Sequence, residues 1–166
     1  MLIAAATTAV LFALWHLGVV LPRGGPLDGA GARASSPVDA GDVVTVAFPV
    51  ANEELDEEVE IRSATPVGVS PHLEIVDVAI GRCRRANGGC LTMTYDTWPP
   101  RRVVVEDDAG FRLGRDDHVF VVVGVRVPEE PGRYGIRAVE VDYSQGWRRH
   151  RGEAGWEIDL RVRNPR

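Results

Sequence analysis

Cys83 and Cys90 are the residues of this chain whose types and spacing most directly suggest chemistry. They enclose a loop of six residues whose tip, Asn87-Gly88-Gly89, favours a turn. Outside the cytoplasm an even number of cysteines predicts a disulfide, and closing so short a ring would stabilise the fold by about 2.5 kcal/mol. A zinc site needs further ligands, and a redox pair usually has the spacing C-x-x-C. We predict a structural Cys83–Cys90 disulfide, with metal-binding or free thiols as the alternatives.

Carboxylates are concentrated in the segment from Glu53 to Glu60, where six of the eight residues are acidic. Calcium takes six to eight oxygen ligands at about 2.3–2.6 Å, so such a segment can suggest a calcium site. The spaced D-x-D-x-D-G pattern of a calcium loop is absent from this sequence. We predict a solvated turn and an outward strand face here, and calcium binding remains the alternative.

Arginines occur in three clusters, at residues 82–85, 101–102 and 148–151. Guanidinium groups bind carboxylates and phosphates in a bidentate manner. If hairpin tips converge at one end of a β-sandwich, Arg84, Arg85 and Arg149 would lie near Trp147, an aromatic anchor of the kind that partners bury. We predict a partner-binding surface at these four residues. Scattered solubility charge and hairpin packing of Trp147 remain the alternatives.

No catalytic set is recognisable. His72, His118 and His150 belong to no metal or nucleophile motif, and Ser70 lacks the G-x-S-x-G elbow of a hydrolase. Neither a P-loop nor a dinucleotide fingerprint is present. The sequence therefore predicts a protein that is not an enzyme and needs no cofactor.

The elements that must position these residues are strands. Apolar residues alternate with a period of two in several segments, and the strongest, His118 to Val127, has valine at every second position. Phe120 and Val122 occupy its other face, which predicts a central strand covered on both sides. Short strands with Gly/Pro turns between them favour a two-sheet sandwich, with a closed barrel as the alternative. The predicted strands are residues 42–50, 59–63, 73–80, 91–95, 103–105, 118–127, 134–143 and 156–162, with breaks at 66–71 and 98–100 and turns at 110–117.

The amino-terminal segment has a different composition. An apolar run from Leu2 to Leu21 matches the hydrocarbon thickness of a bilayer, about 30 Å at about 1.5 Å per residue. We predict a transmembrane helix or signal anchor at 1–21, a flexible Pro/Gly/Ala/Ser linker at 22–41 and a β-sandwich domain at 42–166. A cleaved signal peptide is the alternative. Arg23 after the run favours a cytoplasmic domain, whereas the cysteine pair favours an extracytoplasmic one, which we predict.

The charge of the chain excludes one class of partner. All 19 basic residues are arginine, and the formal net charge is −5. A general nucleic-acid binder should carry a basic surface, so we predict no nucleic-acid partner.

The sequence Pro131-Gly132-Arg133-Tyr134 places a tyrosine after a turn, at the start of a late strand. In immunoglobulin-like sandwiches a tyrosine at this corner donates its hydroxyl hydrogen bond to nearby backbone. With the predicted anchor and the Gly146-Trp147 hairpin, the chain resembles single-pass actinobacterial membrane proteins of unknown function that carry one Ig-like domain. The resemblance implies an all-β, Ig-like fold and no particular ligand.

These observations together predict a non-enzymatic, membrane-tethered extracytoplasmic module that binds another envelope protein. The alternative is an ion- or ligand-binding accessory subunit of an envelope transporter or enzyme, which would use the acidic segment.

Overall fold

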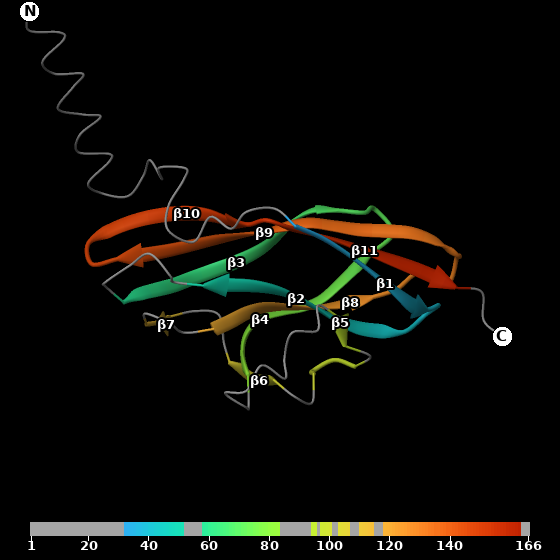
Figure 1. Ribbon diagram of the computed structural model, residues 1–166, viewed down its shortest axis with the longest axis horizontal. Helices are drawn as coiled ribbons and strands as arrows, with labels where there is room; N and C mark the ends of the chain where they lie inside the picture. Colours follow the sequence, from blue (N-terminus) through green and yellow to red (C-terminus); the bar gives the residue numbers. More distant parts are fainter. Residues whose placement is uncertain are drawn as a thin grey trace, which may run out of the picture.

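The computed structural model describes residues 32–51, 58–83, 94–95, 97–100, 103–106, 110–114 and 118–163. These residues form two β-sheets that lie one above the other (Figure 1). One sheet has the six strands β1 (Ala32–Asp39), β3 (Val59–Val69), β7 (Phe111–Leu113), β9 (Gly132–Gln145), β10 (Arg148–Ala154) and β11 (Trp156–Arg163). The other has the five strands β2 (Val43–Ala51), β4 (Glu74–Cys83), β5 (Thr94–Tyr95), β6 (Val103–Glu106) and β8 (His118–Arg126).

The main core lies between the two sheets. Every second residue of a strand contributes its side chain to this core, because successive side chains of a strand point to opposite faces of the sheet. Val119, Val121, Val123 and Val125 of β8 are at most 1% exposed and all belong to this core. The predicted central strand is therefore confirmed on this face. From the other sheet, its largest fully buried side chain is Tyr143 of β9.

A second, smaller core covers the outer face of the five-stranded sheet. Phe120 and Val122 of β8 lie there at 7% and 0% exposure, which confirms that this strand is covered on both sides. Trp98 packs against this cluster from the segment that connects β5 and β6. The Thr45 hydroxyl, buried in β2, donates a hydrogen bond to the Thr97 carbonyl. This bond fixes the segment that contains Trp98 to β2.

The strand order identifies the architecture. The central strands of the six-stranded sheet run β11-β9-β3, and those of the other run β2-β8-β4. In chain order these correspond to the G-F-C and B-E-D strands of an immunoglobulin-like sandwich. β10 and β11 follow each other along the same edge of β9, where Ala154 pairs with Val139 and Ile158 with Ile136. The fold is an all-β, Ig-like sandwich, as the sequence predicted.

The corner between β8 and β9 is the one that the sequence indicated. The Tyr134 hydroxyl donates a hydrogen bond to the Glu130 carbonyl at 3.0 Å, and the tyrosine is 8% exposed. The ring of His72 meets the Tyr134 ring edge-on at 6.4 Å. The predicted tyrosine corner is therefore confirmed.

Tyr134→Phe should lower the free energy of unfolding by about 1 kcal/mol, because it deletes this hydrogen bond and keeps the ring. Urea denaturation of both proteins measures the difference. An unchanged midpoint would mean that the corner hydrogen bond contributes nothing net to stability.

Several boundaries differ from the prediction. Residues 32–39, predicted as flexible linker, form β1, which pairs with β11 in parallel from Ala32↔Trp156 to Asp39↔Arg163. The predicted break at 66–71 begins too early, since β3 continues to Val69 with Pro66 opposite Val139, and the chain leaves the strand only at Ser70. Small and polar residues hide the alternation of β1, whose Val38 is buried. The turn predicted at 110–117 contains β7, because its three residues pair with β3. β10, which pairs with β9, was not predicted as a strand.

The predicted anchor, residues 1–21, lies outside the described residues, as does the linker up to residue 31. In the part of the chain that the structure describes, no helix has the length and apolarity needed to cross a membrane. The membrane anchor and the extracytoplasmic location therefore stay predictions.

Candidate functional site

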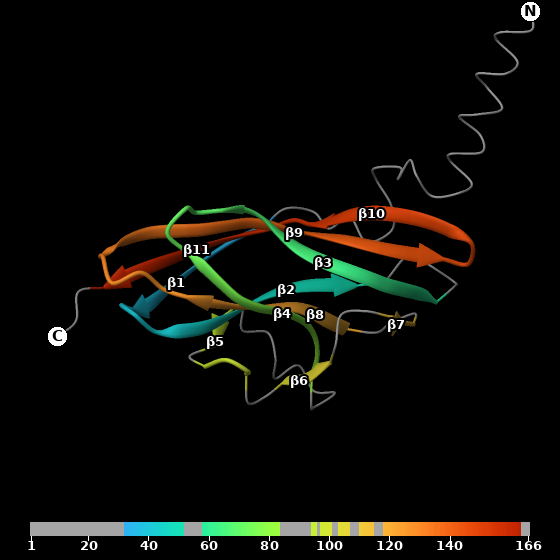
Figure 2. The same ribbon diagram turned by 180° about the vertical axis from the view of Figure 1, so that it is seen from behind.

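The most prominent feature of the surface is the tip of the β9–β10 hairpin. Gln145 pairs with Arg148, which leaves Gly146 and Trp147 as a two-residue turn. Gly146 has a φ of +56°, a conformation that glycine adopts without steric cost and that such hairpin turns require. The hairpin predicted from Gly146-Trp147 is confirmed, and it forms one end of the molecule (Figure 2).

The side chains of the tip form a small amphipathic surface. Trp147 is 61% exposed, whereas most large apolar side chains of the described residues are buried. The Arg148 guanidinium lies 5.1 Å from the centroid of the Trp147 ring, in cation–π geometry. Arg149, the next residue of β10, is also exposed and has no salt bridge to any described residue. We call Trp147, Arg148 and Arg149 the hairpin tip.

Arg151, two residues further along β10, is engaged within the sheet. Its guanidinium donates to both carboxylate oxygens of Asp142, at 2.7 and 3.2 Å, and lies 3.3 Å from Glu140. The hydrogen bond to Asp142 is the main cause that raises the pKa of Arg151. Ser63 of β3 donates a further hydrogen bond to Asp142 at 3.4 Å. The ion pair joins β10 to β9, so we assign Arg151 a structural role.

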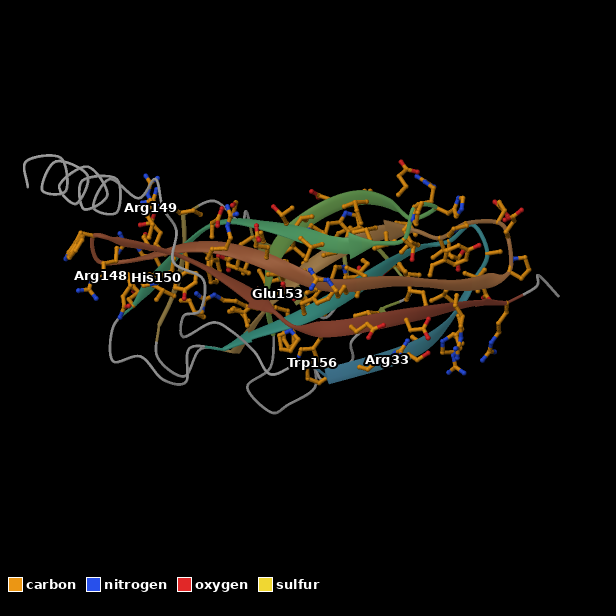
Figure 3. The ribbon with its side chains drawn as sticks, turned by 90° about the horizontal axis from the view of Figure 1, so that it is seen from above. Arg33, Arg148, Arg149, His150, Glu153 and Trp156 are labelled. Carbon is orange, nitrogen blue, oxygen red and sulfur yellow. The ribbon has the colours of Figure 1, made fainter. Side chains whose placement is uncertain are left out.

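His150 lies at the same end of β10 and is stacked on Tyr143. The ring centroids are 5.3 Å apart and the ring planes are inclined by 16°. Both ring nitrogens of His150 are buried, and neither has a hydrogen-bond partner among the described residues. This burial, together with the charge of Arg148, lowers the pKa of His150. Figure 3 shows His150 near Arg148 and Arg149, so the stack lies at the same end of β10 as the hairpin tip.

Acid should therefore weaken the fold at this stack. Because the folded state holds the pKa of His150 below that of the unfolded chain, both states are neutral above about pH 6.5. As the pH falls through that value, the unfolded chain takes up the proton first and unfolding becomes easier. We expect the urea midpoint of the wild type to fall more between pH 7.5 and 5.5 than that of His150→Gln. Parallel pH profiles for the two proteins would contradict this assignment.

The register of the strands shows which loops share this end. Ala51, the last residue of β2, pairs with His118, the first of β8. Arg82 pairs with Val119, so β4 ends at this end in Cys83. Val59, the first residue of β3, pairs with Gln145 of the hairpin. β3, which follows the acidic segment, thus begins beside the end of β9, and β2 and β4 both end beside the start of β8.

Several predicted residues lie outside the described residues, namely Arg84, Arg85, Cys90 and residues 53–57 of the acidic segment. The predicted disulfide and the predicted roles of Arg84 and Arg85 therefore stay predictions. Within the acidic segment, Glu58 lies 3.2 Å from Arg112. In the described ranges no group of three or more histidine, cysteine or acidic side chains could hold a metal ion.

Sequence reasoning missed a polar hollow on the outer face of the six-stranded sheet, towards the opposite end. Its volume is about 290 Å³. Each of its three arginines has an acidic partner: Arg33 lies 3.2 Å from Glu157, Arg137 3.2 Å from Glu153, and Arg133 3.8 Å from Asp159. The lining comes from four segments of the chain, so no local pattern could reveal it. The residues that line it are Arg33, Gly68, Ser70, Arg133, Gly135, Ile136, Arg137, Glu157 and Asp159.

Comparison with known proteins assigns the chain to no protein family. No protein-family model and no curated protein matches the chain. Among solved structures, a family 123 glycoside hydrolase from Clostridium perfringens matches 80% of this chain at 9% identity, with a TM-score of 0.46. The VesB protease of Vibrio cholerae matches 90% at 13% identity, with a TM-score of 0.41. The chain spans 23% and 34% of these two proteins.

Two further structures are matched over most of their own length. A non-cellulosomal cohesin from Archaeoglobus fulgidus has 14% identity and a TM-score of 0.39, over 80% of this chain and 89% of that one. The PapD-like domain 7 of human CEP192 has 9% identity and a TM-score of 0.37, over 86% and 91%. Because these scores are low, the assignment as an Ig-like sandwich depends on the strand order and the tyrosine corner of this chain.

Proposed function

We propose that this protein is a non-enzymatic binding module of the bacterial envelope, tethered to the membrane by its amino-terminal segment, and that it holds a protein partner at the hairpin tip. The observation that carries the proposal is the exposed Trp147 with Arg148 in cation–π contact with its ring, followed in the chain by the exposed Arg149. Tryptophan and arginine are the side chains most enriched among residues that dominate binding energy at protein interfaces.

The chemical state of the hairpin tip supports a binding role. Trp147 presents a large apolar surface to water, and burying it against a partner would release that surface from solvent. The nearby Arg151 is already satisfied by Asp142 and Glu140. Arg149 has no such carboxylate among the described residues, so it is available to bind an acidic group of a partner. The tip therefore joins an aromatic anchor to positive charge that no carboxylate of the described residues neutralises.

Sequence composition supports the tether. Ten residues separate Leu21, the end of the apolar run, from Ala32, the first residue of β1. A fully extended chain of that length reaches about 35 Å. With its Pro/Gly-rich composition, this tether would let the domain reach partners close to the membrane.

The partner contact can be tested with a photoreactive amino acid at position 147 of the full-length protein in its own cells. We expect a discrete cross-linked product at this position. Adding Arg149→Ala should reduce the yield several-fold, because one charge that faces the partner is removed. The matched control is the same probe at Arg161, an exposed position on β11, with no product expected.

Equal products from positions 147 and 161 would contradict a specific site at the hairpin tip. Trypsin added to intact cells tests the location, since the domain is rich in arginine. If position 147 still cross-links to a partner but trypsin cannot reach the domain on intact cells, the proposed envelope location is wrong and the proposed binding role still holds.

A further inference from the structure

Two glycines leave room for the polar hollow on the outer face of the six-stranded sheet. Gly135 of β9 lies opposite Asp159 of β11, and Gly68 belongs to β3. A Cβ at Gly68 would lie 2.6 Å from the Cβ of Arg137, and a Cβ at Gly135 would lie 3.2 Å from the Ile158 carbonyl oxygen. Both glycines line the hollow, so a side chain at either position would take up part of its space.

The backbone of the hollow is held in place from both sides of Gly135. The Gly135 amide donates a hydrogen bond to the Ser70 hydroxyl at 2.8 Å, and the Ser70 amide donates one to the Gly135 carbonyl at 2.9 Å. On its other side Gly135 pairs with Asp159 in the sheet. The hollow is therefore formed before any ligand arrives, which lowers the cost of binding.

The charges of the hollow are negative in its buried part and positive at its rim. The Asp159 side chain is 10% exposed, and the Arg133 Nε lies 3.8 Å from its carboxylate, which is longer than a hydrogen bond. The side chains of Arg33, Arg133 and Arg137 are 60% to 71% exposed, and each contacts its carboxylate through one nitrogen. A guanidinium group has five N–H donors, so the rim retains donors for a ligand. Figure 3 looks onto this face of the sheet and labels Arg33.

This arrangement favours a small ligand with one carboxylate and several neutral hydroxyl groups. The carboxylate would bind the guanidinium groups of the rim, and a hydroxyl group would donate to Asp159. A doubly charged phosphate would be repelled by the buried carboxylate, and an ammonium group would be repelled by the rim. The volume of about 290 Å³ matches the small end of ligand pockets, which span about 300–1,000 Å³.

We propose that the polar hollow binds an acidic sugar, with a ring hydroxyl donating to Asp159 and the sugar carboxylate bound by Arg133 and Arg137. A single hexuronate ring has the required combination of one negative charge and several hydroxyl donors. Hydrogen bonds and charge would supply the selectivity of this site. The inference is separate from the proposed function, which depends on the hairpin tip.

The probe is D-glucuronate, titrated into the full chain in nanodiscs. Three control ligands separate the contributions. Glucose lacks the carboxylate, acetate lacks the hydroxyl groups, and glucosamine has an ammonium group and no carboxylate. Ligand-observed NMR gives the dissociation constants, and hydrogen exchange of residues 133–137 and 157–159 reports where the sugar binds.

We expect glucuronate to bind and to slow exchange in both of these stretches, and each control ligand to bind at least about tenfold more weakly. Arg137→Gln should weaken glucuronate about tenfold, because it removes charge-assisted hydrogen bonds. The matched control is Arg126→Gln on β8, where the arginine also pairs with one exposed carboxylate, that of Glu74 at 3.0 Å, and binding should be unchanged. Gly135→Ala should also weaken binding, because its methyl group would occupy the hollow.

Three outcomes would overturn the inference. Failure of glucuronate to bind would mean that the charges of the hollow serve only as ion pairs within the sheet. Equal binding of acetate would indicate contact with an anion and no recognition of a sugar. Equal binding by the Arg137→Gln protein, with its urea midpoint unchanged, would place the sugar elsewhere. The cross-link at position 147 does not involve the hollow, so none of these results affects the proposed function.

Discussion

Tyr143→Ala is expected to lower the free energy of unfolding by about 3–5 kcal/mol, the range for deleting a large buried aromatic side chain. Tyr143 is fully buried, pairs with Ile61 of β3 and stacks on His150 of β10. Its removal would leave a cavity between the strands that support the hairpin tip. Chemical denaturation measures the loss of stability, and hydrogen exchange should show the amides of residues 148–151 becoming faster than those of β8.

Tyr143→Phe is the matched control, because it keeps the ring and its stack on His150. We expect a loss of about 1.5 kcal/mol or less from this change. A loss below about 1 kcal/mol for Tyr143→Ala would show that the hairpin end of the core collapses to fill the space. Uniform acceleration of exchange across all strands would contradict a local role at the tip.

Gly124→Ala should also lower the free energy of unfolding substantially, although it adds a single methyl group. A Cβ at Gly124, in the middle of β8, would lie 2.6 Å from Cδ2 and 2.9 Å from Cε3 of Trp98. The indole would have to leave the outer face of the five-stranded sheet and expose the second core. Overpacking of this kind costs about 1–3 kcal/mol. Urea denaturation measures the cost, and the fluorescence of Trp98, taken as the difference from Trp98→Phe, should shift to the red.

A double-mutant cycle tests the cause of that loss. In a Trp98→Ala background there is no ring for the new methyl group to meet, so Gly124→Ala should cost little. We expect a coupling energy of about 1–3 kcal/mol between the two sites. Additive effects would mean that the cost of Gly124→Ala comes from strand geometry and not from Trp98.

The fold was predictable where side chains alternate. β8 has valine at every second position and apolar residues on both faces, and its two-sided burial followed directly. The tyrosine corner was predictable because a turn and one aromatic residue define it locally. β1 was missed because parallel pairing with β11 supplies its strand character, and Ala32, Ser35 and Ser36 carry little apolar signal.

The candidate site divides in the same way. A two-residue turn at Gly146-Trp147 fixes the register of the hairpin, so counting outward from it places His150 opposite Tyr143. The exposure of Trp147 and the structural role of Arg151 depend on neighbours from β9, which composition does not show. The polar hollow is a tertiary feature, since several strands must pair before it exists.

The parallel pairing of β1 with β11 has a mechanical consequence. The two strands run in the same direction, with Ala32 beside Trp156 at one end and Asp39 beside Arg163 at the other. A pull applied at Ala32 and at Arg163 would load all eight residue pairs in shear at once, instead of opening them one after another. Forced unfolding is governed by the rate of unfolding rather than by equilibrium stability. A domain held at its amino-terminal side would therefore resist such tension until the pairing between β1 and β11 breaks as a unit.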